Sequence, residues 1–247
     1  MQKTRVLGII PARWASTRFP GKPLHPIAGK PLIQHVWDQC NKTHSLDEIL
    51  IATDDARIAE SAESFGAKVV MTSNDHVSGT DRIAEAAQTD QDCTHIINIQ
   101  GDEPLIDPGL IDQLAEKISN DSTICMITAA VLGINNLDLA NSNVVKTVIN
   151  KENNAIYFSR SVIPHQNSES PAAPCYRHKG IYGYTIDFLL KFVRWEPSPL
   201  ELAERLEQLR AIENGASIHV IITDDNSIGV DTPEQAIMVE QQILANT

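Results

Sequence analysis

The sequence has few cysteines and no long apolar run. Its four cysteines lie far apart in the 247 residues, at positions 40, 93, 125 and 175, and form no C-x-x-C pair. This spacing gives no support to a zinc or redox motif, so we expect buried thiols in a reducing compartment. No stretch approaches the roughly 18 apolar residues of a membrane span. Residues 1–8 also lack the apolar centre of a signal peptide, so we expect a cytoplasmic protein without membrane insertion.

The sequence is also short of positive charge. Its 20 Lys and Arg residues face 32 Asp and Glu residues, which gives a formal net charge of -12. Nucleic-acid binding depends on a basic surface that neutralises phosphates, so this balance argues against a nucleic-acid partner. An anionic small ligand would need a local basic cluster or a bound metal ion to offset the overall charge.

Short apolar runs alternate with helical patterns over the first half of the chain. Strands are predicted at residues 5–11, 48–53, 68–71 and 95–100, and helices at residues 31–40, 56–65, 80–88 and 108–118. Four strand–helix units predict an α/β fold with a mostly parallel, doubly wound sheet. In such a sheet the ligand crevice lies beyond the carboxyl ends of the strands. The loops that follow these strands are therefore the first candidates for a site.

The pattern changes after an apolar run at residues 124–131. Three β segments, at residues 144–149, 155–158 and 179–185, follow without long helices between them, which predicts a mixed extension over the crevice. Residues 166–174 are rich in Ser, Pro and Ala and predict a flexible loop, either a lid or a surface connection. Residues 200–213 predict one amphipathic helix that buries the apolar residues Leu202, Leu206, Leu209 and Ile212.

The loop after the first strand carries three cations, Arg13, Arg18 and Lys22. Such a cluster can bind a triphosphate, since arginine offers forked donors and lysine a point charge. A solvated basic loop is the alternative, but the position at a strand end favours a ligand. The loop is not a Walker A motif, because Ser16 takes the place of the first glycine and Pro23 follows the lysine.

Two aspartates are candidate metal ligands. Asp102 follows the fourth predicted strand directly, in the segment QGDEP, and Asp231 precedes a predicted C-terminal helix, in the segment GVDTP. An aspartate before a helix is also an ordinary structural residue. Magnesium prefers one or two carboxylates together with water and phosphate oxygens, so these two aspartates would suffice once a nucleotide is bound.

These segments together resemble the 3-deoxy-manno-octulosonate (Kdo) cytidylyltransferases, also called CMP-Kdo synthetases. The resemblance spans nearly the whole chain and rests on the ordered segments PARWASTRFPGKPL, ATDD, SGTDR, QGDEP, YFSR, RHKGIYGY, EQLR and GVDTP. It implies a nucleotide-diphospho-sugar transferase (Rossmann-like) fold, Mg²⁺ as cofactor and a homodimer. It also implies one domain over residues 1–247, with a nucleotide-binding core at 1–130 and 215–247 and a sugar-binding and dimerisation extension at 131–214.

The resemblance assigns roles to individual residues. The residues that it implies for CTP binding are Arg13, Ser16, Arg18, Lys22, Ser78 and Arg82. The residues that it implies for catalysis are Arg13, Lys22, Asp102 and Asp231, of which the two aspartates hold the metal. The sugar pocket maps onto Gln100, Arg160, His178, Tyr182, Glu207 and Gln208. Without the resemblance, the last four would be read as packing or solvent-facing residues. The sequence departs from the expected pattern at Lys179, where an apolar residue is commoner.

The sequence therefore predicts an enzyme that joins CTP to Kdo and releases pyrophosphate, for lipopolysaccharide synthesis. A cytidylyltransferase for another acid sugar, such as 8-amino-Kdo or a sialic acid, is the nearest alternative. A glycosyltransferase that consumes a nucleotide sugar is a second one, although such enzymes usually carry D-x-D in place of QGDEP. A binding protein without turnover is a third, and the presence of both aspartates argues against it.

Overall fold

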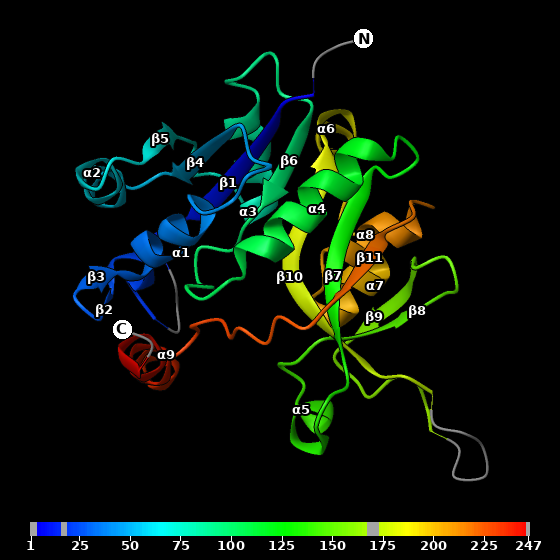
Figure 1. The fold of residues 1–247 in the computed structure, drawn as a ribbon. Helices are drawn as coiled ribbons and strands as arrows, with labels where there is room; N and C mark the ends of the chain where they lie inside the picture. The colour runs from blue at the N-terminus through cyan, green and yellow to red at the C-terminus, as the bar shows by residue number, and fades with distance from the viewer. Residues whose placement is uncertain (1–3, 16–18, 167–172, 246–247) are drawn as a thin grey trace.

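A computed structural model describes residues 4–15, 19–166 and 173–245, and its centre is one twisted sheet (Figure 1). The strands follow the order β11-β7-β10-β6-β1-β4-β5, and β8 and β9 extend the sheet from β10. Their bounds are β1 (Val6–Ala12), β4 (Glu48–Thr53), β5 (Lys68–Met71), β6 (His95–Asn98), β7 (Met126–Leu132), β8 (Lys146–Ile149), β9 (Ala155–Ser159), β10 (Tyr176–Thr185) and β11 (His219–Thr223). Strands β5, β4, β1 and β6 are parallel, whereas β10 is antiparallel to both its neighbours. The predicted α/β class with a mostly parallel sheet is confirmed.

Helices cover both faces of this sheet. One face packs against α1 (Leu32–Cys40), α2 (Ala56–Ser64) and α4 (Pro108–Asn120). The other face packs against α3 (Gly79–Ala87), α6 (Ile186–Phe192) and α8 (Gln208–Glu213). Successive residues of β1 alternate between the two cores, with Ile10 in the first and Ile9 in the second, as a strand buried on both sides requires. In the described part of the chain, no helix combines the length and the apolar character needed to cross a bilayer.

The order of the parallel strands creates a switch point between β1 and β6. From β1 the chain proceeds outward to β4 and β5, and it then returns to β6 on the other side of β1. Loops at the carboxyl ends of β1 and β6 consequently diverge and leave a crevice between them. The predicted basic loop follows β1 and the predicted QGDEP segment follows β6, so both open onto this crevice.

The single helix predicted over residues 200–213 is wrong. The chain forms α7 (Pro199–Glu204) and α8, and Arg205 between them takes a left-handed conformation with φ of 54°. Helical spacing of the apolar residues does not reveal the break. Leu206 and Leu209 are buried as predicted, but Leu202, which was also predicted to be buried, is 66% exposed. The break turns the carboxylates of Glu204 and Glu207 toward different partners, Ser159 and Thr80 respectively.

The residues predicted as an extension contribute to the centre of the sheet as well as to its edge. Strand β10 lies between β6 and β7, and the β8–β9 hairpin continues from its first residues. Helix α5 (Asn136–Ala140) lies beyond the end of β7, at the bottom of Figure 1. The division at residues 131 and 214 stays a prediction.

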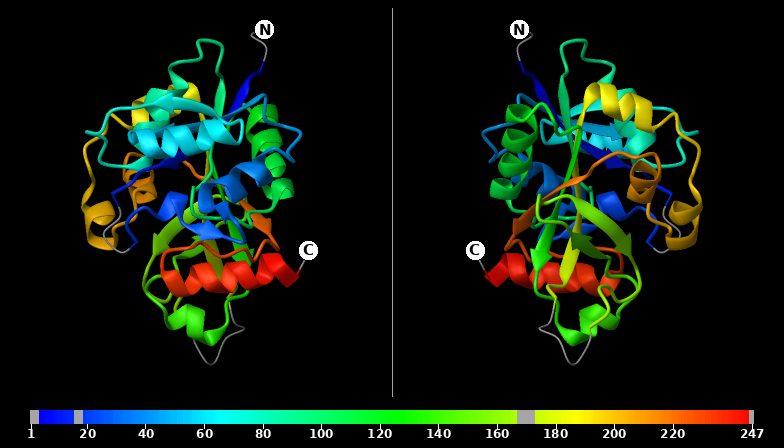
Figure 2. Two further views of the ribbon diagram at one scale, coloured as in Figure 1. Left: turned by 90° about the vertical axis from the view of Figure 1, so that its left-hand side faces the viewer. Right: turned by 90° about the vertical axis from the view of Figure 1, so that its right-hand side faces the viewer.

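The C-terminal segment returns to the N-terminal half of the molecule. Helix α9 (Pro233–Ala245) packs beside a small hairpin formed by β2 (Pro26–Ile27) and β3 (Lys30–Pro31), as Figures 1 and 2 show. A separate apolar cluster joins them, in which Val230 and Val239 meet Ile27 and Leu32. The short helix η1 (Lys22–Leu24) precedes the hairpin. This packing brings the GVDTP segment from the end of the chain to the switch point.

Candidate active site at the strand ends

A pocket of about 290 Å³ lies at the switch point. It is lined by residues of four separate segments: Pro11, Ala12, Arg13, Lys22 and Pro23; His76, Val77, Ser78, Gly79 and Arg82; Gln100, Gly101 and Asp102; and Asp231. Seven of the residues predicted for the site are thus brought together from positions up to 218 residues apart in the sequence. Ser16 and Arg18, which were also predicted, lie outside the described residues.

Glycine allows the backbone at two places around this pocket to pack closely. A Cβ atom at Gly101 would stand 2.9 Å from the carbonyl oxygen of Pro11, so the ends of β1 and β6 approach as only glycine permits. Gly21 has a φ of 69°, and its N–H donates to the carbonyl of Trp14 at 3.2 Å. That bond closes the basic loop and turns Lys22 back toward the pocket.

Lys22 joins the two predicted metal ligands. Its Nζ lies 2.6 Å from Oδ2 of Asp102 and 3.2 Å from Oδ1 of Asp231. The lysine side chain is 16% exposed, whereas the carboxylates are 30% and 47% exposed, so both remain accessible from the pocket. Two carboxylates that reach one ammonium group are close enough together to share another cation. No group of three or more acidic, His or Cys side chains suited to a metal occurs among the described residues.

The backbone holds Asp231 beside Asp102. The N–H of Val230 donates to the carbonyl of Asp102 at 2.8 Å. The side chain of Gln235, in the first turn of α9, accepts from the N–H groups of Asp231 at 2.7 Å and of Thr232 at 3.0 Å. These bonds fix the direction from which the Asp231 carboxylate enters the pocket.

The amino end of α3 forms another side of the pocket. Ser78 caps this helix through a capping box with Asp81, and Gly79 packs against the ring of Pro11. A capped helix start presents backbone N–H groups and a partial positive charge, which suits an anion. Arg82 is 3% exposed and donates to Asp54 Oδ2 at 2.9 Å and to Thr72, so it also ties α3 to the ends of β4 and β5.

Three of the residues predicted for the sugar form a continuous group next to this pocket. The ring of His178 lies 5.5 Å from that of Tyr182. Burial, and then the negative charge of Glu207, raises the pKa of Tyr182. Gln100, which lines the pocket, lies beside the stretch of β10 between His178 and Tyr182, since a Cβ at Gly180 would stand 3.6 Å from its side chain. Burial, and then the charge of Lys179, lowers the pKa of His178 to about 3. His178 is therefore neutral and acts as a hydrogen-bonding and packing group.

Glu207 connects this group to α3. Its carboxylate accepts a hydrogen bond from the hydroxyl of Thr80, and burial raises its pKa. Gln208 is 5% exposed at the start of α8. The side chain of Glu207 is 28% exposed, and such a partly buried carboxylate can accept hydrogen bonds from sugar hydroxyls.

Arg160 is held by the backbone in the structure. Its guanidinium donates to the carbonyls of Glu204 at 2.8 Å, Ser142 at 3.0 Å and Arg205 at 3.4 Å. It lies beyond the described lining of the pocket, as do His178, Tyr182, Glu207 and Gln208. The structure thus places five of the six predicted sugar residues outside the lining of this pocket, and the sixth, Gln100, within it.

Sequence reasoning missed several residues at this site. His76 lines the pocket and bonds to Glu85, and Thr80 holds Glu207. Thr80 stands inside the segment SGTDR and could have been found from it, whereas nothing in the sequence distinguishes His76. Lys179 was noted only as a departure, yet it is 4% exposed and contacts the loop that carries Asp102.

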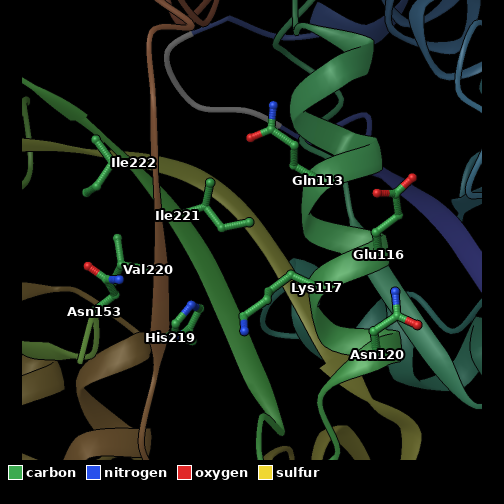
Figure 3. A pocket seen from close by; sticks show the side chains of 9 residues that line it. All are labelled: Gln113, Glu116, Lys117, Asn120, Asn153, His219, Val220, Ile221 and Ile222. Carbon is green, nitrogen blue, oxygen red and sulfur yellow. The ribbon is translucent and has the colours of Figure 1, made fainter.

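A larger groove of about 560 Å³ lies elsewhere, between α4 and β11 (Figure 3). Lys117 extends from α4 toward His219 on β11, and burial together with that lysine lowers the pKa of His219. None of the predicted site residues lines this groove. Its position beside a strand at the sheet edge separates it from the switch point.

Comparisons with known proteins agree with this geometry. A family model described as Cytidylyltransferase matches residues 7–218. The 3-deoxy-manno-octulosonate cytidylyltransferase of Geobacter metallireducens is 46% identical over 97% of this chain and 98% of its own length. The protein of the same name from Solibacter usitatus is 46% identical over 98% of this chain and 96% of its own length. A solved structure of CMP:2-keto-3-deoxy-manno-octonic acid synthetase complexed with CTP has a TM-score of 0.94 and 38% identity, and the match covers 99% of this chain and 100% of that one.

Proposed function

We infer the function from one premise: the chain belongs to the 3-deoxy-manno-octulosonate cytidylyltransferases. It transfers the cytidylyl group of CTP to Kdo and yields CMP-Kdo and pyrophosphate, a step of lipopolysaccharide biosynthesis. The observation on this chain that carries the inference is the meeting of Lys22, Asp102 and Asp231 at the switch point, next to the capped start of α3. A triphosphate needs this combination of cations, helix N–H groups and metal-binding carboxylates.

The reaction replaces a phosphoanhydride bond of CTP by a phosphoester bond to the sugar. The anomeric hydroxyl oxygen of Kdo forms a bond to the α-phosphorus of CTP, and the bond from that phosphorus to the bridging oxygen of pyrophosphate breaks. The hydroxyl proton passes to solvent. In our proposal Arg13 and Lys22 bind the phosphates and stabilise the charge that builds on the leaving pyrophosphate. Ser78 and Arg82 hold the nucleotide side of the pocket in shape.

Asp102 and Asp231 fit a magnesium ion. Two carboxylate oxygens that meet one cation, with nucleotide phosphates completing the shell, are a ligand set that Mg²⁺ accepts. A bound Mg²⁺ would reduce the repulsion between the anionic sugar and the anionic nucleotide. Lys22 would then have to give up its contact with one or both carboxylates and turn toward the phosphates, which its flexible side chain allows.

Recognition of the sugar is proposed for the group that adjoins the pocket. The side chains of Gln100, Tyr182, Glu207 and Gln208 offer polar groups that can bind hydroxyls, and neutral His178 packs against Tyr182 with its ring tilted by 48°. Arg160 is the candidate partner for the sugar carboxylate. Its present bonds go to neutral carbonyls, and a carboxylate is the stronger acceptor for a guanidinium fork.

We also propose a cytoplasmic homodimer that uses residues 131–214 as its interface. Half of the exposed large apolar side chains in the part of the chain that the structure describes belong to this range: Leu132, Leu137, Ile156, Val162, Leu200 and Leu202. Such a concentration is typical of a surface that another chain covers. The cytoplasm is the proposed location because it supplies CTP.

The function is tested by measuring pyrophosphate release from CTP and Mg²⁺ with Kdo, 8-amino-Kdo and a sialic acid in parallel. We expect release with Kdo at the highest kcat/KM. Preference for one of the other sugars would keep the mechanism and replace the substrate. Absence of release with all three would contradict the proposed activity.

A further inference from the structure

Lys179 is buried next to the proposed metal site, although it stands in a strand in the middle of the sheet. It belongs to β10, between β6 and β7, and only 4% of its side chain is exposed. A lysine without partners would be very costly there, because burial removes the water that stabilises its charge. Its partners therefore define what the residue does.

The ammonium of Lys179 is surrounded by two segments far apart in sequence. Its Nζ lies 3.0 Å from Oε2 of Glu103 and 3.3 Å from Oδ2 of Asp225. It also donates to the hydroxyl of Ser227 at 2.7 Å and to the carbonyl of Ser227 at 3.0 Å. Side chains of both acids are nearly buried, at 12% and 6% exposure. We call Lys179, Glu103, Asp225 and Ser227 the lysine cluster.

The partners of Lys179 lie in the same two loops as the proposed metal ligands. Glu103 follows Asp102 in the loop after β6, and residues 225–227 begin the segment that ends at Asp231. The two segments touch again beyond the cluster, where Val230 N–H donates to the Asp102 carbonyl at 2.8 Å and Gly229 packs against Glu103. The two aspartates therefore project from a pair of loops that one buried lysine joins.

We propose that Lys179 is a positioning residue that sets the separation of Asp102 and Asp231 and so prepares them to share a metal ion. The inference rests on the proposed function, since it concerns the metal of that reaction. Lys179 does not touch the reactants in this account. It acts through Glu103 on one loop and through Asp225 and Ser227 on the other.

A charged cluster performs this task better than an apolar contact would. Apolar groups can slide past one another at little cost, whereas a buried ammonium keeps its place because leaving its partners exposes uncompensated charge. Outer partners of metal ligands commonly determine the affinity for the metal, and their loss costs roughly 10- to 100-fold. Lys22 is a second cation that joins the C-terminal segment to the QGDEP loop, through its contacts with Asp102 and Asp231.

The test is the binding of Mn²⁺, used as a paramagnetic substitute for Mg²⁺, in the presence of CTP and without sugar. Electron paramagnetic resonance gives the fraction of free Mn²⁺ and hence the dissociation constant. For Lys179→Met we expect this constant to rise roughly 10- to 100-fold. Asp225→Asn keeps the size of the side chain and should raise it in the same direction by a smaller factor, and this variant serves if Lys179→Met does not fold.

The matched control is Lys146→Met. Lys146 is also fully buried, but it stands on β8 and donates to the carbonyls of Asn141, Val144 and Arg160, outside the two loops. Its variant should bind Mn²⁺ as the unaltered protein does. The proposal is overturned if folded Lys179→Met and Asp225→Asn bind Mn²⁺ within about twofold of the unaltered protein, or if Lys146→Met weakens binding as much. If the unaltered protein itself binds no Mn²⁺ with CTP, the metal role in the proposed function fails first.

Discussion

Lys22 contacts both of the aspartates proposed to bind the metal ion. The three residues lie in separate segments of the sequence, so only the folded chain shows that a single ammonium reaches both carboxylates. The sequence motifs predicted the three residues separately, and the crevice expected at the carboxyl ends of parallel strands predicted that the first two segments lie close together. That Asp231 joins them depends on the packing of α9, which no local pattern reveals.

Replacing Asp102 by Asn tests this unit. The amide keeps the size of the side chain but removes the negative charge that the metal and Lys22 require, so we expect kcat to fall roughly 10²- to 10⁴-fold. Steady-state pyrophosphate release measures the effect. Asp92→Asn, on an exposed loop, is the matched change and should leave kcat unaltered. Near-normal turnover of Asp102→Asn would remove this residue from the metal site.

Arg160 supports a second prediction at the residue scale. Arg160→Lys retains one positive charge but loses the planar fork that can bind a carboxylate through two bonds. Loss of one or two charge-assisted bonds corresponds to roughly a 10- to 100-fold rise in the KM for Kdo. The KM for CTP should change little, since Arg160 is not part of the described pocket lining. An unchanged KM for Kdo would assign the sugar carboxylate to another cation.

At the scale of elements, the spacing of apolar residues predicted the strands and helices of the first half of the chain, but it did not predict where one element breaks into two. Apolar runs predicted β1, β4, β5 and β6 to within a few residues. Strands β1, β4 and β6 are largely buried between the helical layers and are therefore mostly apolar, whereas β5 at the sheet edge is partly exposed. The break between α7 and α8 could not be predicted from the pattern, because Leu202, Leu206 and Leu209 keep helical spacing across Arg205. The side chains of Glu204 and Glu207 on either side of it accept hydrogen bonds from Ser159 and Thr80, which are distant in sequence and therefore invisible to a local pattern.

The junction of β1 with the loop after β6 yields an element-scale prediction. Gly101→Ala would push a methyl group against the Pro11 carbonyl, 2.9 Å away, and separate the two strand ends. We expect a loss of about 1–3 kcal/mol in the free energy of unfolding and a lower kcat/KM for CTP. Denaturant unfolding and initial rates measure the two effects. Gly109→Ala is the control, because it lies in the first turn of α4, where alanine is the better helix former.

At the scale of the whole molecule, the proposed dimer is the first property to measure. Light scattering after size exclusion should give twice the mass of one chain. Ile156→Glu on β9 introduces a charge at a side chain that is 57% exposed, and it should shift the molecule toward the monomer if that surface is covered by a second chain. Leu244→Glu on α9 makes the same change outside residues 131–214 and should leave the dimer intact. A monomeric unaltered protein would contradict the proposal.

Stability in acid is a property of the whole fold, and buried His178 is expected to lower the free energy of unfolding as the pH falls. Burial holds the pKa of this side chain at about 3, below its ordinary value of 6.5. Between these values the unfolded chain binds a proton that the folded chain does not, so stability is full above pH 6.5 and falls as the pH drops toward 3. The slope due to one such group is up to about 1.4 kcal/mol per pH unit.

Replacing His178 by Asn should remove this contribution. Carboxylates with lowered pKa values, such as Asp121, also lose stabilising charge as the pH falls, but they are common to both proteins and cancel in the difference. Urea unfolding of both proteins from about pH 7.5 to about pH 4.5 gives the two slopes. At the upper end the imidazole is neutral in both states, and any difference there reports only the lost packing and the contact with Thr128. Parallel curves over the whole range would show that His178 takes up its proton in the folded protein.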